Sequence, residues 1–160
     1  MGDVRERIHS TYLTRVLDFG HRYRVLERAV EAATKMHAEY SFDAVVFTGM
    51  SGALIAPAVA DALGLDLLIV RKPSDDSHHS SENWRAPYLD GYIQTGARLL
   101  WVDDVVSSGR TFARVQREID AYDMVIAGIL LYSADLRNSY IPSEIPTVCL
   151  SRENLCHYED

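Results

Sequence analysis

Apolar residues recur with the period of an α-helix in three parts of the chain. The first stripe lies at about residues 24–39 and the third follows residue 111, and each gives a helix one buried face. Between them, an almost wholly apolar stretch at about 52–64 follows Ser51, which we expect to cap a helix that ends at Gly64. Pro57 fits this helix only if it begins close before the proline. The apolar positions of the first and third stripes are Val25, Leu26, Ala29, Val30, Ala33 and Met36, and Phe112, Val115, Ile119 and Tyr122.

Five shorter apolar runs lack the helical period and predict buried β-strands. They are rich in valine, leucine and isoleucine, and glycine or polar residues stop them, as is typical of strands in a parallel sheet. The five runs are 43–49 (DAVVFTG), 65–70 (LDLLIV), 97–102 (ARLLWV), 124–132 (MVIAGILLY) and 147–150 (TVCL).

The order of these elements predicts an α/β fold with three α/β/α layers and a mainly parallel central sheet of about five strands. Residues 71–92 separate two of the strands and show no period, which is typical of a functional loop. Ligands in such sheets bind beyond the carboxyl ends of the strands. Three segments follow a strand directly and are therefore candidates for a site: 48–52, the residues from 71 onward, and 103–111.

Composition and charge narrow the class of protein. A chain of 160 residues with 48% apolar and 24% charged residues is typical of one globular domain. The net charge of −7, without a basic block, argues against nucleic-acid binding. The charged N-terminus has no apolar core of a secretory signal, and no run approaches the ~18 apolar residues of a membrane span. Two cysteines without metal-site spacing favour reduced thiols, so we expect a cytoplasmic protein.

The stretch LLWVDDVVSSGRTF (99–112) carries the most distinctive chemistry. A buried strand ends in Asp103 and Asp104, and a small polar loop follows and leads into a helix. Hydroxyls, a glycine and the N–H groups at the helix start suit a phosphate, whereas ionised carboxylates suit the hydroxyls of a sugar. A sugar phosphate meets both demands. The plain alternative is a solvated acidic pair followed by a serine-capped helix.

Residues 99–111 resemble the phosphoribosyl-pyrophosphate (PRPP) signature of type I phosphoribosyltransferases, in which four apolar residues, two acidic residues and a small polar loop closing on Gly-x-Thr follow one another. The resemblance extends over about 43–131, because VVFTGMSG (45–52) is similar to the family's pyrophosphate loop and VRKP (70–73) to the start of its catalytic loop. It implies that Asp103 and Asp104 contact the ribose hydroxyls. The implied PRPP-binding residues are Asp103, Asp104, Val105, Ser107, Ser108, Gly109, Arg110 and Thr111.

The same resemblance implies the rest of the site. Lys72, Arg71 and Asp104 would be the catalytic residues, and Mg²⁺ would be held through oxygens of PRPP instead of protein ligands. His78 and His79 would lie in the catalytic loop, where they would bind pyrophosphate, relay a proton or face solvent. Ser133 and Asp135 are candidates for reading the base. The implied pyrophosphate-binding residues are Thr48, Gly49, Met50, Ser51, Gly52, Arg71 and Lys72.

The expected function is transfer of a 5-phosphoribosyl group from Mg-PRPP to a nucleobase, with purine slightly preferred over orotate. Met50 and Ser51 stand where adenine-type members carry an acidic residue and an arginine, so the pyrophosphate loop has no charged side chain. A PRPP-sensing regulator of the same fold therefore remains an alternative, and an unrelated α/β binding module is a third. We expect a core at about 24–150, a small hood from 1–23 and 133–160 over the base, no nucleic-acid or membrane partner, and a homodimer as one state to test.

Overall fold

The computed structural model describes residues 16–72, 88–92, 94–106, 108–133 and 140–150. Six strands form one sheet in the order β3-β2-β1-β4-β5-β6, and all neighbours pair in parallel except β2 and β3. The elements are α2 (Phe19–Tyr40), β1 (Ala44–Phe47), α3 (Gly49–Ala53), α4 (Ala56–Leu63), β2 (Asp66–Val70), β3 (Leu89–Asp90), β4 (Arg98–Asp103), α5 (Arg110–Asp120), β5 (Val125–Leu131) and β6 (Thr147–Cys149).

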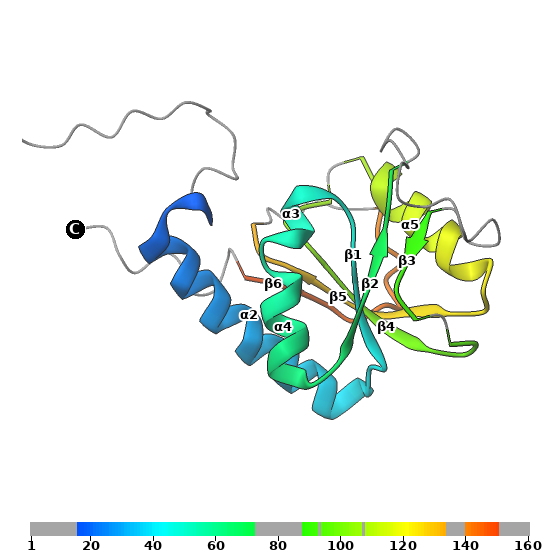
Figure 1. Cartoon of the computed structure of the whole chain (residues 1–160), viewed down its shortest axis with the longest axis horizontal. Coiled ribbons are helices and arrows are strands. Elements are labelled where there is room, and N and C mark those ends of the chain that lie inside the picture. Colours follow the sequence, from blue (N-terminus) through cyan, green and yellow to red (C-terminus); the bar gives the residue numbers. More distant parts are fainter. Residues whose placement is uncertain (1–15, 73–87, 93, 107, 134–139, 151–160) are drawn as a thin grey trace, which may run out of the picture.

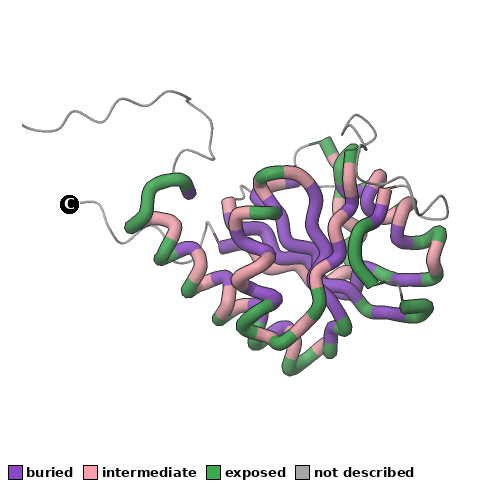
Figure 2. Tube along the Cα trace, viewed as in Figure 1, coloured by how far each residue is buried: buried purple, intermediate pink, exposed green. Residues whose placement is uncertain are grey.

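Helices cover both faces of the sheet, as Figure 1 shows, with α2 and α4 on one face and α5 on the other. The predicted three-layer α/β fold is therefore confirmed. Successive strand residues point to opposite faces, so Leu100 and Val102 of β4 join the core beneath α2 and α4. Leu99 and Trp101 join the core beneath α5. Figure 2 shows that burial follows the sheet, while the outer sides of the helices are exposed.

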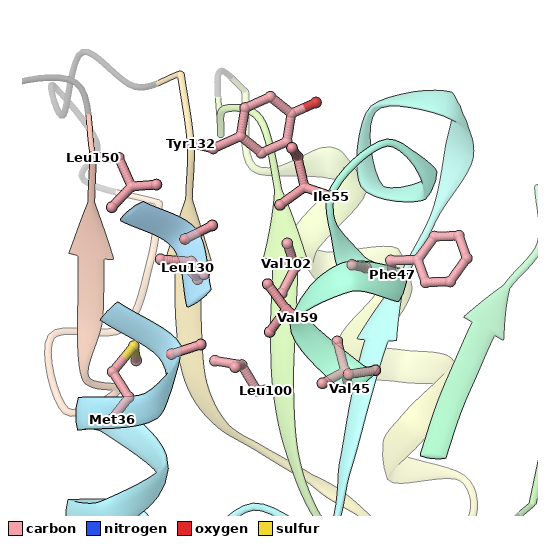
Figure 3. Packing of buried hydrophobic residues seen from close by; sticks show 14 of the residues in the cluster. Met36, Val45, Phe47, Ile55, Val59, Leu100, Val102, Leu130, Tyr132 and Leu150 are labelled. Carbon is pink, nitrogen blue, oxygen red and sulfur yellow. The ribbon is translucent and has the colours of Figure 1, made fainter. Parts of the chain in front are cut away.

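The core beneath α2 and α4 is closely packed around the central strands. In Figure 3, Met36 of α2 and Val59 of α4 lie over the strands that carry Leu100 and Leu130. On the opposite face, the wholly buried Trp101 packs against Phe112 in the first turn of α5, with ring centroids 5.3 Å apart. The indole N–H of Trp101 has no hydrogen-bond partner among the described residues.

The structure corrects the boundaries of two predicted helices. The first begins at Phe19 instead of residue 24, because Asp18 caps it by accepting the N–H of His21 at 3.0 Å. The helix predicted at about 52–64 is two helices, α3 and α4. Pro57 lacks an N–H, and its ring excludes the carbonyl four residues earlier, so a continuous helix cannot pass from Ala53 into α4. Pro57 lies in the first turn of α4, and Gly64 ends it, both as expected.

The sheet also has one strand more than expected. β3 falls inside the segment 71–92, which showed no period, and pairs antiparallel with the end of β2 through Val70 and Leu89. Two residues are too few to show a period-two pattern, so the sequence carried no sign of this strand. Most of the two hood candidates lies outside the described residues, and the hood stays a prediction. No helix in the described ranges is long and apolar enough to cross a membrane.

Candidate active site

The carboxyl ends of β1, β2 and β4 lie next to one another, because β1 pairs with β2 on one side and with β4 on the other. This adjacency brings together the three segments predicted to form a site. The hydroxyl of Ser51, after β1, donates to Oδ1 of Asp103, at the end of β4, over 2.8 Å. The hydroxyl of Thr48 donates to the carbonyl of Val70, at the end of β2, over 2.6 Å. Side-chain hydrogen bonds therefore join β1 to both of its neighbours at this edge.

The segment 48–52 after β1 turns sharply into α3. Thr48 is extended and buried, and Gly49 has a φ of +66°, a left-handed conformation that favours glycine. Ser51 does not cap a helix, contrary to our expectation. It lies inside α3, where its hydroxyl binds Asp103 and its carbonyl accepts the hydroxyl of Tyr132 at 2.7 Å. Hydrogen bonds with Asp103, at the end of β4, and with Tyr132, just after β5, therefore fix the position of this loop.

Asp103 and Asp104 are both buried, with exposed fractions of 3% and 4%. Oδ1 of Asp103 accepts the Ser51 hydroxyl and the N–H of Asp104, whereas Oδ2 of Asp104 is buried and has no hydrogen-bond partner in the described part of the chain. The N–H groups of Tyr132 and Ser133 bind the carbonyls of the two aspartates at 3.1 and 2.8 Å. A buried carboxylate oxygen without a partner costs free energy, so Asp104 is suited to receive a donor from a ligand.

Burial raises the pKa of Asp103 to about 7, and the neighbouring Asp104 carboxyl adds to the rise, first through a hydrogen bond between the two side chains, which Asp103 can donate while it is protonated, and then through its charge. The hydrogen bonds from the Ser51 hydroxyl and the Asp104 N–H act in the opposite direction, because they stabilise the ionised form. The charge of Asp103 therefore changes near neutral pH, and a donor from a bound molecule would favour its ionised form.

The polar side chains of the loop from β4 to α5 lie at the surface. Gly109, with a φ of +72°, occupies the N-cap position of α5 without a side-chain cap, while the hydroxyl of Ser108, one residue earlier, accepts the N–H of Arg110 at 3.5 Å. A serine therefore contacts the start of this helix, as the plain alternative also expects. Ser108, Arg110 and Thr111 are exposed, Val105 is half-buried, and Ser107 lies outside the described residues. A surface pocket of about 380 Å³ opens beside the loop, between the first turns of α5 and Tyr140. Free N–H groups at a helix start can bind an anion.

Arg71 and Lys72 follow β2 and differ in their surroundings. The N–H of Arg71 binds the carbonyl of Tyr88 at 2.8 Å, and its guanidinium lies 2.8 Å from Asp90 of β3. Lys72 is exposed and reaches back toward the loop after β1, where its Nζ lies 3.8 Å from the position that a Cβ on Gly49 would take. Lys72 is thus placed beside the uncharged loop, whereas the Arg71 side chain faces a carboxylate in this structure.

Two residues, Arg114 and Tyr132, hold residues of the site in place, and the sequence did not predict this role for either of them. Arg114 of α5 donates to the hydroxyl of Thr48 at 2.9 Å and to the carbonyl of Arg71 at 2.7 Å, and Tyr132 holds Ser51. The sequence places Arg114 on a helix 66 residues away from Thr48, so no local pattern points to this contact. Ser133 is half-buried next to Asp104, whereas His78, His79 and Asp135 lie outside the described residues.

The described residues do not form a metal site by themselves. Nowhere in the described ranges do three or more His, Cys, Asp or Glu side chains gather as a metal ion would need. The unpartnered Oδ2 of Asp104 is nevertheless a free acceptor at the strand ends. A carboxylate oxygen is a ligand that Mg²⁺ can take, so the chemistry of Asp104 is compatible with such an ion.

Comparisons with known proteins show the family to which the chain belongs. The model of the phosphoribosyl transferase domain matches residues 18–157. An adenine phosphoribosyltransferase of Desulfitobacterium hafniense (strain Y51) is 31% identical over 125 residues, which make up 73% of this chain and 70% of that protein.

Solved structures share the fold at lower identity. The adenine phosphoribosyltransferase of Saccharomyces cerevisiae, complexed with an imino-altritol bisphosphate and adenine, has a TM-score of 0.68 at 19% identity, covering 88% of this chain and 84% of its own. The orotate phosphoribosyltransferase of Aeropyrum pernix has a TM-score of 0.57 at 21% identity, covering 76% and 63%. At these identities the likeness concerns the fold alone. The family match over most of the chain, together with the acidic pair and the loops that surround it, identifies the protein as a phosphoribosyltransferase of the type I family.

Proposed function

We propose that this enzyme transfers the 5-phosphoribosyl group of Mg-PRPP to a purine base and releases pyrophosphate. The observation that carries the proposal is the buried acidic pair at the end of β4, in which Oδ2 of Asp104 has no partner among the described residues. Two hydroxyls of a ribose are donors that such a pair can accept. The open loop that follows, at the start of α5, suits the 5′-phosphate of the same molecule.

Each of the three strand ends then has its own part of PRPP. Asp103 and Asp104 accept the ribose hydroxyls, and residues 107–111 donate N–H and O–H groups to the 5′-phosphate. Residues 48–52 meet the diphosphate through their N–H groups, and Lys72, beside Gly49, offsets its negative charge. Arg71 contributes when its guanidinium turns from Asp90 toward the diphosphate. Placement and charge stabilisation of this kind are the main means by which an enzyme favours a displacement at C1.

In the reaction, a nitrogen of the base forms a bond to C1 of the ribose while the bond from C1 to the diphosphate oxygen breaks. The proton of that nitrogen passes to the departing pyrophosphate or to water. The ribose gains positive charge in the transition state, which the nearby ionised carboxylates stabilise. A magnesium ion bound with PRPP would supply positive charge to the leaving group. Oδ2 of Asp104, which is buried and has no partner among the described residues, is the acceptor that we propose for a ribose hydroxyl.

A purine acceptor is supported by the relatives. The protein of Desulfitobacterium hafniense is an adenine phosphoribosyltransferase, and the Saccharomyces cerevisiae structure contains adenine. The stretch VRKP (70–73) also leans toward the purine type. Orotate is the second acceptor to test, because orotate phosphoribosyltransferases share the fold. The cytoplasmic location and a homodimeric state remain predictions.

One assay tests donor and acceptor together. The protein is incubated with PRPP, Mg²⁺ and one base at a time from a panel of adenine, guanine, hypoxanthine and orotate, and pyrophosphate release is followed. Release with a purine and not with orotate is the expected result. If PRPP binds and raises the melting temperature but no base releases pyrophosphate, the catalytic proposal fails and the PRPP-sensing regulator takes its place. If PRPP does not bind, the donor assignment itself is wrong.

A further inference from the structure

Arg114 connects two strand ends of the site from the opposite layer. Its side chain is half-buried. Nη1 donates to the carbonyl of Arg71 over 2.7 Å, and Nη2 donates to the hydroxyl of Thr48 over 2.9 Å. That hydroxyl in turn donates to the carbonyl of Val70 over 2.6 Å. One guanidinium therefore fixes the end of β2 and the first residue of the loop that follows β1.

Arg114 forms no ion pair with an acidic side chain in the described part of the chain. Both of its acceptors are uncharged oxygens. The loop it holds, TGMSG (48–52), has no charged side chain of its own. A half-buried cation is less screened than a surface one. Its field consequently extends into the space above Thr48 and Gly49.

We propose that Arg114 is a positioning residue for the diphosphate: it holds Thr48 in place and supplies, from behind, positive charge that the loop 48–52 lacks. This inference rests on the proposed function, because it requires a donor with a diphosphate at that loop. The loop's N–H groups can receive an anion only if Thr48 and Gly49 keep their conformation, and Arg114 fixes the hydroxyl of the first of these residues. The anion then meets a loop that is both rigid and positive.

The position of Arg114 on α5 adds a connection between two parts of the site. The same helix begins at Arg110, in the loop assigned to the 5′-phosphate, and Arg114 lies one turn further along. A displacement of the helix start thus reaches the diphosphate loop through a single side chain. Lysine cannot replace this arrangement, because the two hydrogen bonds require the planar fork of a guanidinium.

The experiment compares three variants by calorimetry in the presence of Mg²⁺. Arg114→Met removes the charge and both hydrogen bonds, and Arg114→Lys keeps the charge but loses the fork. Arg117→Met is the matched control, because Arg117 lies on the same helix, is exposed and contacts Glu118 beside it. Each is titrated with PRPP, with pyrophosphate and with ribose 5-phosphate, which has the same sugar but no diphosphate.

We expect Arg114→Met to weaken PRPP and pyrophosphate binding by about tenfold or more, since hydrogen bonds and charge are lost together. Ribose 5-phosphate should bind within about twofold of the wild type, because its phosphate lies at the start of α5. Arg114→Lys should recover part of the loss, and Arg117→Met should bind all three ligands as the wild type does.

The possible failures can be told apart. If the wild type does not bind PRPP, the proposed function falls, and this inference with it. If the wild type binds PRPP and Arg114→Met binds PRPP and pyrophosphate equally well, the role of Arg114 is refuted while the function stands. An equal loss of ribose 5-phosphate would show general damage to the fold and would also refute it.

If Arg114→Met does not fold, Thr48→Val provides the second test, because it removes only the hydroxyl that Arg114 binds. It should weaken pyrophosphate binding and spare ribose 5-phosphate. An unchanged affinity for pyrophosphate in Thr48→Val would contradict the proposal.

Discussion

The loops that follow β1 and β4 lie side by side but are built in opposite ways. In the loop after β1, the polar groups of Thr48 and Ser51 bind other parts of the chain, namely Val70, Arg114, Asp103 and Tyr132. In the loop after β4, one carboxylate oxygen is buried without a partner in the described ranges, and the start of the following helix is held by a long bond, from the N–H of Arg110 to the hydroxyl of Ser108 at 3.5 Å.

This difference separates a loop that is preorganised from one that depends on a ligand. A loop whose side chains are held by the protein presents its N–H groups in a fixed arrangement, which lowers the cost of binding. A buried acceptor without a donor is instead stabilised when a ligand supplies one. We therefore expect substitutions after β4 to alter PRPP binding most, and substitutions after β1 to alter stability and diphosphate binding.

The largest effect is expected at the acidic pair. Asp104→Asn replaces an acceptor oxygen by an amide donor, so a ribose hydroxyl loses a bond to a charged group worth about 1.5–3 kcal/mol. PRPP should bind at least about tenfold more weakly, and the double variant with Asp103→Asn should show no thermal shift with Mg-PRPP. The control is Asp61→Asn on the exposed surface of α4, which should bind PRPP normally. Full affinity in the double variant would remove the ribose assignment.

The raised pKa of Asp103 predicts how stability depends on pH. The native state keeps this proton up to about pH 7, whereas the unfolded chain releases it near the ordinary value of 3.8. Since the native state binds more protons across this window, the free energy of unfolding should fall as pH rises from about 4 to 7. The contribution of this group is at most about 1.4 kcal/mol per pH unit.

Asp103→Asn removes that titration and should gain stability relative to the wild type as pH rises. Denaturant unfolding of both proteins at pH 5, 6, 7 and 8 measures the difference. A difference in the free energy of unfolding that is the same at all four values would contradict the raised pKa.

Two glycines allow a paired test of the loops. Gly49 and Gly109 both have a positive φ, so alanine costs about 1–2 kcal/mol at either position. At Gly109 the new Cβ would also lie 2.7 Å from Cβ of Tyr140, whereas at Gly49 the nearest atoms are 3.7 and 3.8 Å away on Lys72. Gly109→Ala should therefore destabilise the protein by about 1 kcal/mol more than Gly49→Ala. Equal melting temperatures for the two variants would mean that Tyr140 does not press on this loop.

The smallest effect is expected at Tyr132. Tyr132→Phe leaves the carbonyl of Ser51 without the phenol donor and should lower the free energy of unfolding by about 1 kcal/mol. Tyr92→Phe is the matched control, because the Tyr92 side chain is largely exposed and should tolerate the change. If the two variants unfold alike, Tyr132 does not brace the loop after β1.

The fold was predictable because its strands are short apolar runs and its helices have one apolar stripe. Those patterns depend on neighbours in the sequence, and so do the acidic pair and the small polar loop after it. The prediction was wrong where Pro57 divides an apolar stretch that was predicted to be one helix into α3 and α4. It also missed β3, which has only two residues, too few to give a pattern. The added strand changed the sheet from five strands to six.

The supporting residues of the site could not be predicted in the same way. Arg114 reaches Thr48 across 66 residues and Tyr132 reaches Ser51 across 81, so their partners are set by the packing of layers. At Ser51, a local pattern was misleading because a contact distant in the sequence decides the role of the side chain. A serine before an apolar stretch suggests a helix cap, yet its hydroxyl binds Asp103, which only the pairing of β1 with β4 brings within reach.

The contact between Trp101 and Phe112 makes the proposed sugar-donor site accessible to fluorescence measurements. Trp101 is wholly buried two residues before Asp103, and its ring contacts Phe112 in the first turn of α5, which follows the loop proposed to bind the phosphate. An indole in apolar surroundings emits at short wavelength, and its intensity depends on the side chains against it. The chain has one other tryptophan, Trp84, so a Trp84→Phe variant would leave Trp101 as the single emitter. Fluorescence of that variant would follow the end of β4 and the start of α5 together, without any label.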